Sequence, residues 1–122
     1  MLLINPKAVE NILKSYLGAW VTVYVDRPLG SRHPKYPELI YPINYGYIEG
    51  LSAGDGEEQD AYILGIDLPL SRFSGRVIAI IHRSNDVEDK LVVAPDGVGF
   101  TKEQIIELTA FQERYFDIEV EI

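Results

Sequence analysis

The chain has 122 residues, a formal net charge of −8 and no cysteine. This length suits a single domain, 1–122, around one core, and the absence of cysteine excludes disulfides and thiolate metal sites. The negative charge argues against nucleic acid as a general partner, because a phosphate backbone needs a basic protein surface. No apolar run approaches the roughly 20 residues that span a bilayer, and the N-terminal residues lack the basic-then-apolar order of a signal peptide. We therefore expect a cytoplasmic protein that does not bind membranes.

The predicted elements begin with a helix that Asn5 caps, that has Pro6 in its first position and that Gly18 ends. A strand follows at 20–25, where β-branched and aromatic residues alternate with others. The stretch 26–37 holds three prolines and is predicted to be an irregular loop. It also carries a large share of the cationic side chains, which either face solvent or bind an anion.

Several short strands follow the loop, and a second helix comes near the end. Thr101 is predicted to cap this helix in a capping box with Gln104, and Ile105, Leu108 and Phe111 follow helical spacing. The predicted strands, separated by turns or by a loop at 69–74, are 39–48 (broken by Pro42), 60–66, 76–83, 90–94 and 117–122.

These strands are not separated by helices, which makes a parallel sheet built from strand–helix–strand units unfavourable. Short antiparallel strands in a small chain commonly close into a barrel, because closure removes exposed strand edges. We therefore predict a mainly β domain, a small antiparallel barrel flanked by an N-terminal and a C-terminal helix.

Two acidic turns, at 55–60 and 86–89, stand out as candidate chemistry. Crowded carboxylates raise one another's pKa, and a hard divalent cation such as Mg²⁺ removes that cost by binding their oxygens. If both turns open at one mouth of the barrel, with Arg83 before the second turn and Lys90 after it, the set suits metal-dependent phosphoryl transfer to water. The alternative is that both turns are solvated loops with outward charges.

Two further features have a structural alternative. Gly46 between two tyrosines predicts a bulge or a close backbone approach, and the tyrosines are more typical of a core than of a ligand site. His82, at the end of an apolar strand, is predicted to be a barrel-edge residue with satisfied hydrogen bonds.

Two segments lie close together in the sequence, YPINYGYI at 41–48 and DGEEQD at 55–60. With the same spacing, they resemble the YPxNYGYI-like and DGDPxDVLVL segments of the family I soluble inorganic pyrophosphatases. KLVVAP at 90–95 resembles a later segment of the family, and FQERY at 111–115 resembles its last helix. The resemblance covers roughly 28–116, and a hairpin of the family before the first segment is nearly absent here.

The resemblance implies a closed five-stranded OB-like barrel, Mg²⁺ dependence, a small phosphate substrate and a homo-oligomer. It also implies roles for individual residues. Its implied catalytic residues are Asp55, Glu57 and Tyr45; its metal ligands are Asp55, Asp60, Asp86 and Asp89; and its phosphate-binding residues are Lys35, Lys90 and Tyr115, with Arg32 and Arg83 as candidates to replace cations that the chain lacks.

Three departures from the family pattern keep two functions open. Glu57 replaces an aspartate described as a general base, Glu58 replaces a proline, and Phe116 replaces a phosphate-binding lysine. The first expectation is metal-dependent hydrolysis of inorganic pyrophosphate to two phosphates. The alternative is a pyrophosphatase-like scaffold that hydrolyses another diphosphate or only binds a phosphorylated ligand.

Overall fold

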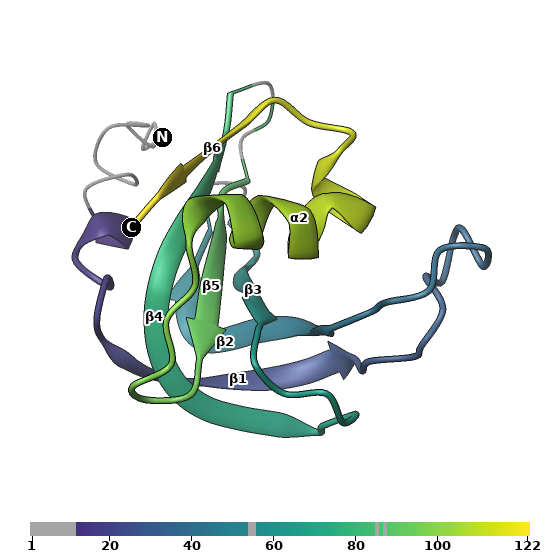
Figure 1. Ribbon diagram of the computed structural model, residues 1–122, viewed down its shortest axis with the longest axis horizontal. Helices are drawn as coiled ribbons and strands as arrows, with labels where there is room; N and C mark the ends of the chain where they lie inside the picture. Colours follow the sequence, from purple (N-terminus) through teal and green to yellow (C-terminus); the bar gives the residue numbers. More distant parts are fainter. Residues whose placement is uncertain (1–11, 54–55, 85, 87) are drawn as a thin grey trace.

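The computed structural model describes residues 12–53, 56–84, 86 and 88–122. Figure 1 shows long curved strands that wrap around a barrel, with one helix lying across its outer wall. The elements are β1 (Trp20–Arg27), β2 (Asn44–Ser52), β3 (Glu58–Ile63), β4 (Arg72–Arg83), β5 (Lys90–Ala94), α2 (Lys102–Glu113) and β6 (Ile118–Glu121).

Five of these strands form a closed barrel in the order β1-β2-β3-β5-β4, and β4 pairs back onto β1. β6 lies outside the ring and pairs with β4. The predicted five-stranded barrel is confirmed, and its neighbouring strands are antiparallel except for β3 and β5, which are parallel. A ring with an odd number of strands cannot alternate direction at every step, so at least one neighbouring pair must be parallel.

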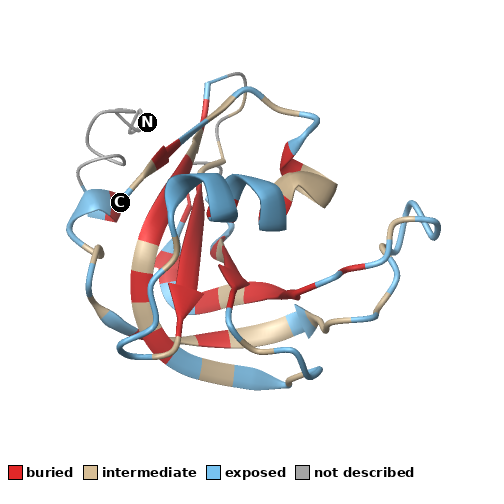
Figure 2. Ribbon diagram, viewed as in Figure 1, coloured by how far each residue is buried: buried red, intermediate tan, exposed pale blue. Residues whose placement is uncertain are grey.

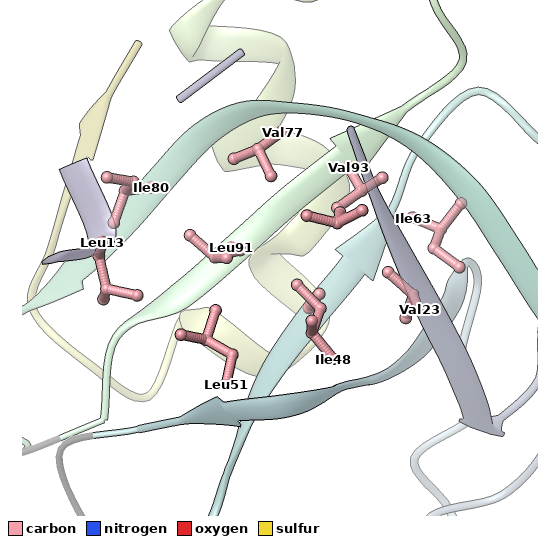
Figure 3. Packing of buried hydrophobic residues seen from close by; sticks show 11 residues of the cluster. Leu13, Val23, Ile48, Leu51, Ile63, Val77, Ile80, Leu91 and Val93 are labelled. Carbon is pink, nitrogen blue, oxygen red and sulfur yellow. The ribbon is translucent and has the colours of Figure 1, made fainter. Parts of the chain in front are cut away.

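The barrel interior is a purely hydrophobic cluster to which all five barrel strands contribute, as Figure 3 shows. Side chains alternate between the two faces of each strand, so Ile63 of β3 and Leu91 and Val93 of β5 point inward. Leu13, which precedes β1, packs against the same cluster. The barrel interior is therefore filled mainly by hydrophobic side chains.

A second hydrophobic cluster lies on the outer wall of the barrel, under α2. It contains the alternate residues of the same strands, such as Tyr62 of β3 and Val92 of β5, together with Ile105 of α2. β5 is accordingly buried on both faces, and α2 exposes its outward side to solvent (Figure 2).

Several predicted elements shift at their ends. The strand at 90–94 and the final short strand are confirmed. β2 occupies 44–52 instead of 39–48, because Pro42 has no N–H to donate, and the segment before it forms only a bridge between Ile40 and Arg32. The loop predicted at 69–74 is wrong for its last three residues, which begin β4 by pairing with β1.

The predicted N-terminal helix is only partly within the described residues. Residues 12–14 are helical, and Gly18 has a φ of 83°, which suits the predicted helix end. Asn5 and Pro6, the predicted start, lie outside the described residues.

The capping box of α2 is confirmed: Thr101 accepts from the Gln104 N–H, and the Gln104 side chain accepts from the Thr101 N–H. The buried face of the helix differs from the prediction, because Leu108 is exposed. The buried residues are Ile105, Thr109 and Glu113. Two of these are polar, so apolar spacing alone could not reveal the face.

Gly46 marks the close backbone approach that its position predicts. A Cβ at this residue would lie 1.9 Å from the carbonyl oxygen of Tyr24 on β1. We expect Gly46→Ala to lower the free energy of unfolding by about 1–3 kcal/mol, as overpacking does elsewhere, measured by urea denaturation. Gly99→Ala is the matched control, because a Cβ there meets no atom within 4 Å. Equal stability of the two variants would contradict the prediction.

Among the described residues, no helix has the length and apolar character needed to cross a membrane.

Candidate active site

A pocket of about 650 Å³ opens beside the C-terminal end of α2. Its walls come from the 28–43 loop, from the outer faces of β2, β3 and β5, and from the residues that follow α2. The prediction placed the acidic groups at a mouth of the barrel. The structure instead gathers Asp60 and Lys90 on the outer wall, because each lies two residues before an outward side chain of the second cluster.

The centre of this pocket is a hydrogen-bonded group from three strands and one turn. Oδ2 of Asp60 accepts hydrogen bonds from the Tyr45 hydroxyl at 2.6 Å and from Nζ of Lys90 at 2.8 Å. Nζ of Lys90 also lies 3.2 Å from Oε1 of Glu88, and the Lys90 side chain is only 3% exposed. One lysine thus holds carboxylates from two separate parts of the chain.

Tyr45 is a proton donor at this centre. Burial raises its pKa well above the ordinary value, and the negative charge of Asp60 raises it further. The phenol therefore keeps its proton at neutral pH and can donate it only in a hydrogen bond, here to Asp60. This geometry suits an orienting residue better than a base.

A buried ion pair forms the wall behind this centre. The guanidinium of Arg83 donates to both carboxylate oxygens of Glu113, at 2.6 and 2.8 Å, and the two side chains are 4% and 0% exposed. The Tyr62 hydroxyl also donates to Glu113 at 2.6 Å. Arg83 reaches Asp86 at 3.2 Å, and its guanidinium lies 3.7 Å from the centre of the Phe116 ring. Arg83 therefore lines the pocket while most of its donors are already engaged.

The Asp89 side chain contacts His82 of β4 and not the centre of the pocket. Its Oδ2 lies 2.8 Å from Nδ1 of His82, and its Oδ1 accepts from the backbone N–H of Arg83 at 3.0 Å. Nε2 of His82 lies 2.8 Å from Glu121 of β6. His82 thus has both ring nitrogens satisfied at the barrel edge, as predicted. Asp89 does not contribute to the described lining of the pocket, and its role as a metal ligand stays a prediction.

His82 makes stability depend on pH. Burial lowers its pKa, but hydrogen bonds to Glu121 and Asp89 outweigh that effect and raise the pKa above its ordinary value. A raised pKa stabilises the fold fully below the unfolded-state pKa of about 6.5, and the contribution is lost as pH rises through the folded-state pKa. Urea denaturation should therefore find the largest stability loss in His82→Gln near pH 5.5 and a smaller loss near pH 8.5. A difference that is flat, or that grows with pH, would contradict this expectation.

Two further arginines line the pocket. Nη1 of Arg27 donates to the Tyr41 hydroxyl at 2.6 Å, and that hydroxyl donates to Gln112 of α2 at 2.8 Å. This chain of hydrogen bonds joins the end of β1 to the helix. Arg114 donates to the Tyr115 hydroxyl at 3.1 Å, and both are exposed.

The residues predicted to bind phosphate divide into two groups. Lys90, Tyr115 and Arg83 line the pocket. Lys35 and Arg32 are exposed and do not contribute to the described lining. The guanidinium of Arg32 donates instead to the Pro37 carbonyl of its own loop at 2.8 Å.

Of the residues predicted to be catalytic or to bind a metal, only some line the pocket. Asp55 lies outside the described residues. Glu57 is exposed and does not contribute to the described lining, whereas Tyr45 and Asp60 do. Asp86 is half-buried against Arg83.

Four residues that the sequence did not single out as site residues shape this site: Arg27, Gln59, Glu88 and Glu113. Glu88 faces the pocket within the predicted acidic turn, where the sequence favoured its neighbour Asp89. The buried Gln59 donates to the carbonyls of Asp60 and Asp89, at 2.9 and 2.7 Å, and so joins the two acidic segments. A glutamine in an acidic turn gives no sequence signal for this role.

The donor chemistry of the pocket fits a hard cation. Mg²⁺ is commonly held by one or two carboxylates, with water and substrate phosphates supplying the other oxygens. Asp60 and Glu88 both line the pocket and meet at Lys90. Within the described ranges, no group of three or more His, Cys, Asp or Glu side chains is arranged to hold a metal. A cation here would therefore need oxygens from a phosphate ligand, from water or from residues outside those ranges.

Comparison with known proteins finds similarity in three dimensions only. No protein-family model matches the chain, and no curated protein sequence matches it. An inorganic pyrophosphatase from Neisseria gonorrhoeae aligns over 93% of this chain and 79% of its own, with a TM-score of 0.62 and 20% identity. One from Ehrlichia chaffeensis aligns over 84% and 85%, with a TM-score of 0.63 and 16% identity. One from Helicobacter pylori aligns over 84% and 82%, with a TM-score of 0.59 and 17% identity.

The chain has the inorganic pyrophosphatase fold. The resemblance that the motifs indicate is confirmed at this level, since the solved structures match most of the chain. In this pyrophosphatase fold the pocket is bounded by Tyr45, Asp60 and Lys90, all three of which the motifs had singled out.

Proposed function

We propose that this chain hydrolyses inorganic pyrophosphate to two phosphates in a reaction that requires Mg²⁺. The observation that carries the proposal is the meeting of Asp60, Glu88, Lys90 and Tyr45 in one pocket of a pyrophosphatase fold. Carboxylates, a buried ammonium and a protonated phenol are the groups that phosphoryl transfer to water needs, because its catalysis depends on positioning and on charge stabilisation.

The reaction adds water to one phosphorus and breaks that atom's bond to the bridging oxygen. Mg²⁺, when bound, neutralises phosphate charge and makes a bound water more acidic. Lys90 lies where its ammonium can bind a phosphate oxygen, and Arg27 supplies a second cation to the same pocket. Tyr45 orients Asp60 through its hydrogen bond. By the resemblance, we assign Asp55 and Glu57 to the activation of water, and Asp86 and Asp89 to further metal binding.

Two further expectations accompany this proposal. The sequence led us to expect a cytoplasmic protein, and the resemblance implies a homo-oligomer. Size-exclusion chromatography with light scattering checks the second expectation, and a mass equal to one chain would contradict it.

Removal of the metal tests the function directly. The purified chain should release phosphate from pyrophosphate in Mg²⁺, lose that activity in excess EDTA, and regain it when Mg²⁺ is restored. Titration of Mg²⁺ and Mn²⁺ with a colorimetric phosphate assay gives the measurement. No release with any divalent cation would reject the hydrolase, and calorimetric binding of pyrophosphate without release would favour the alternative of a binding scaffold.

A further inference from the structure

The pocket is larger than inorganic pyrophosphate requires. Its volume of about 650 Å³ falls in the range of roughly 300–1,000 Å³ that is typical of sites for drug-sized ligands. A diphosphate held at Lys90 and Asp60 would occupy one part of this space. The remainder extends along the 28–43 loop and past the end of α2.

The remaining part of the pocket is aromatic. Tyr36 comes from the loop and Tyr115 follows α2, and their side chains are 56% and 64% exposed. Nδ1 of His33 accepts from the backbone N–H of Tyr36 at 3.2 Å, and the two rings pack with centroids 5.1 Å apart. The loop therefore holds Tyr36 in place although its ring faces solvent. Exposed aromatic rings that line a pocket offer apolar area to a planar ligand.

The pocket also holds two guanidinium groups that take part in no described salt bridge. Lys90 and Arg83 each form salt bridges. In the described part of the chain, Arg27 and Arg114 form none, and each donates to a tyrosine hydroxyl instead. Two of the four Lys or Arg residues that line the pocket therefore offer a guanidinium outside the described salt bridges. These two groups favour an anionic ligand.

We propose that this pocket takes a nucleoside diphosphate, with the diphosphate at Asp60 and Lys90 and the base against Tyr36 and Tyr115. This inference rests on the proposed function and names a wider substrate class for the same site. Water adds to the terminal phosphorus, the bond from that phosphorus to the bridging oxygen breaks, and the nucleoside monophosphate leaves. The products are a nucleoside monophosphate, inorganic phosphate and one proton released to solvent.

Binding of non-hydrolysable analogues tests the ligand class independently of activity. We expect calorimetry in Mg²⁺ to give a dissociation constant for α,β-methylene adenosine diphosphate at least about fivefold below that for methylenediphosphonate, since base–aromatic stacking contributes roughly 1–3 kcal/mol. Tyr36→Ala should remove most of this preference. Trp20→Ala is the matched control, because Trp20 is 55% exposed but does not line this pocket. Equal binding of the two analogues by the unmodified chain would overturn the proposal.

Phosphate release separates failure of this inference from failure of the proposed function. Release from adenosine diphosphate, with a KM that rises in Tyr36→Ala but not in Trp20→Ala, supports the inference. Release from pyrophosphate alone overturns it and leaves the proposed function intact. Preferential binding of the nucleoside analogue without release from any substrate supports the ligand class and rejects the hydrolase.

Discussion

Asp60→Asn should lower kcat/KM for Mg²⁺-dependent pyrophosphate hydrolysis by roughly 100- to 1,000-fold, the range seen when one charge-stabilising group is removed from an active site. Asp60 is the point where Tyr45 and Lys90 meet, at 2.6 and 2.8 Å from the same oxygen. Asparagine keeps the size of the side chain and removes its charge, so the proposed metal site loses a ligand and Lys90 loses one of its two carboxylates. A phosphate-release assay over a range of Mg²⁺ concentrations gives the measurement.

The matched control for this variant is Asp96→Asn. Asp96 also pairs with a cation, Arg76 at 3.2 Å, but its side chain is 67% exposed and does not line the pocket. This variant should retain the activity of the unmodified chain. Urea denaturation of both variants excludes unfolding as the cause of any loss. Full activity in a folded Asp60→Asn would remove the central residue from the proposed mechanism.

Arg83→Met should lower the free energy of unfolding by about 3–5 kcal/mol, the usual effect of removing one partner of a buried ion pair. Glu113 is 0% exposed, and Arg83 donates to both of its carboxylate oxygens. Without the guanidinium, the carboxylate keeps only the Tyr62 hydroxyl among its described hydrogen-bond donors. Urea denaturation followed by circular dichroism measures the loss.

A double-mutant cycle shows whether this loss belongs to the pair. Arg83→Met combined with Glu113→Leu removes both charges, so the two changes should couple favourably by about 1–3 kcal/mol. The exposed pair of Arg76 and Asp96 is the control, and Arg76→Met should lower stability by less than about 1 kcal/mol. Strictly additive effects at Arg83 and Glu113 would show that the pair does not act as a unit.

The sequence did not predict which face of the barrel carries the site. Asp60 is followed directly by the apolar run 61–64. Because this run does not alternate between apolar and polar residues, the sequence does not reveal which side chains point outward. β3 and β5 are buried on both faces, by the barrel interior and by α2. For this reason the sequence predicted a barrel mouth, whereas the structure brings Asp60, Lys90 and Tyr45 together on the outer wall.

The second acidic turn illustrates the same limit at the scale of one residue. Neighbouring side chains of an extended segment point in opposite directions, so of Glu88 and Asp89 only one can face the pocket. The structure turns Glu88 to Lys90 and Asp89 to His82. Asp89 contacts His82 and the backbone of Arg83, both at the end of β4. The sequence does not show where β4 places these two residues, so it gives no way to choose between Glu88 and Asp89.

The sequence by itself determined the type of fold, the capping of α2, the tight approach at Gly46 and the residue types of the site, because these depend on local pattern and on motifs with fixed spacing. Closing five strands into a ring requires at least one parallel pair, but only the structure shows that this pair is β3 and β5. Only the tertiary structure decided which face of the barrel carries the site and which cations are already paired. Those facts depend on contacts between residues far apart in the chain, such as Arg83 with Glu113 and Tyr41 with Gln112, which local pattern does not encode.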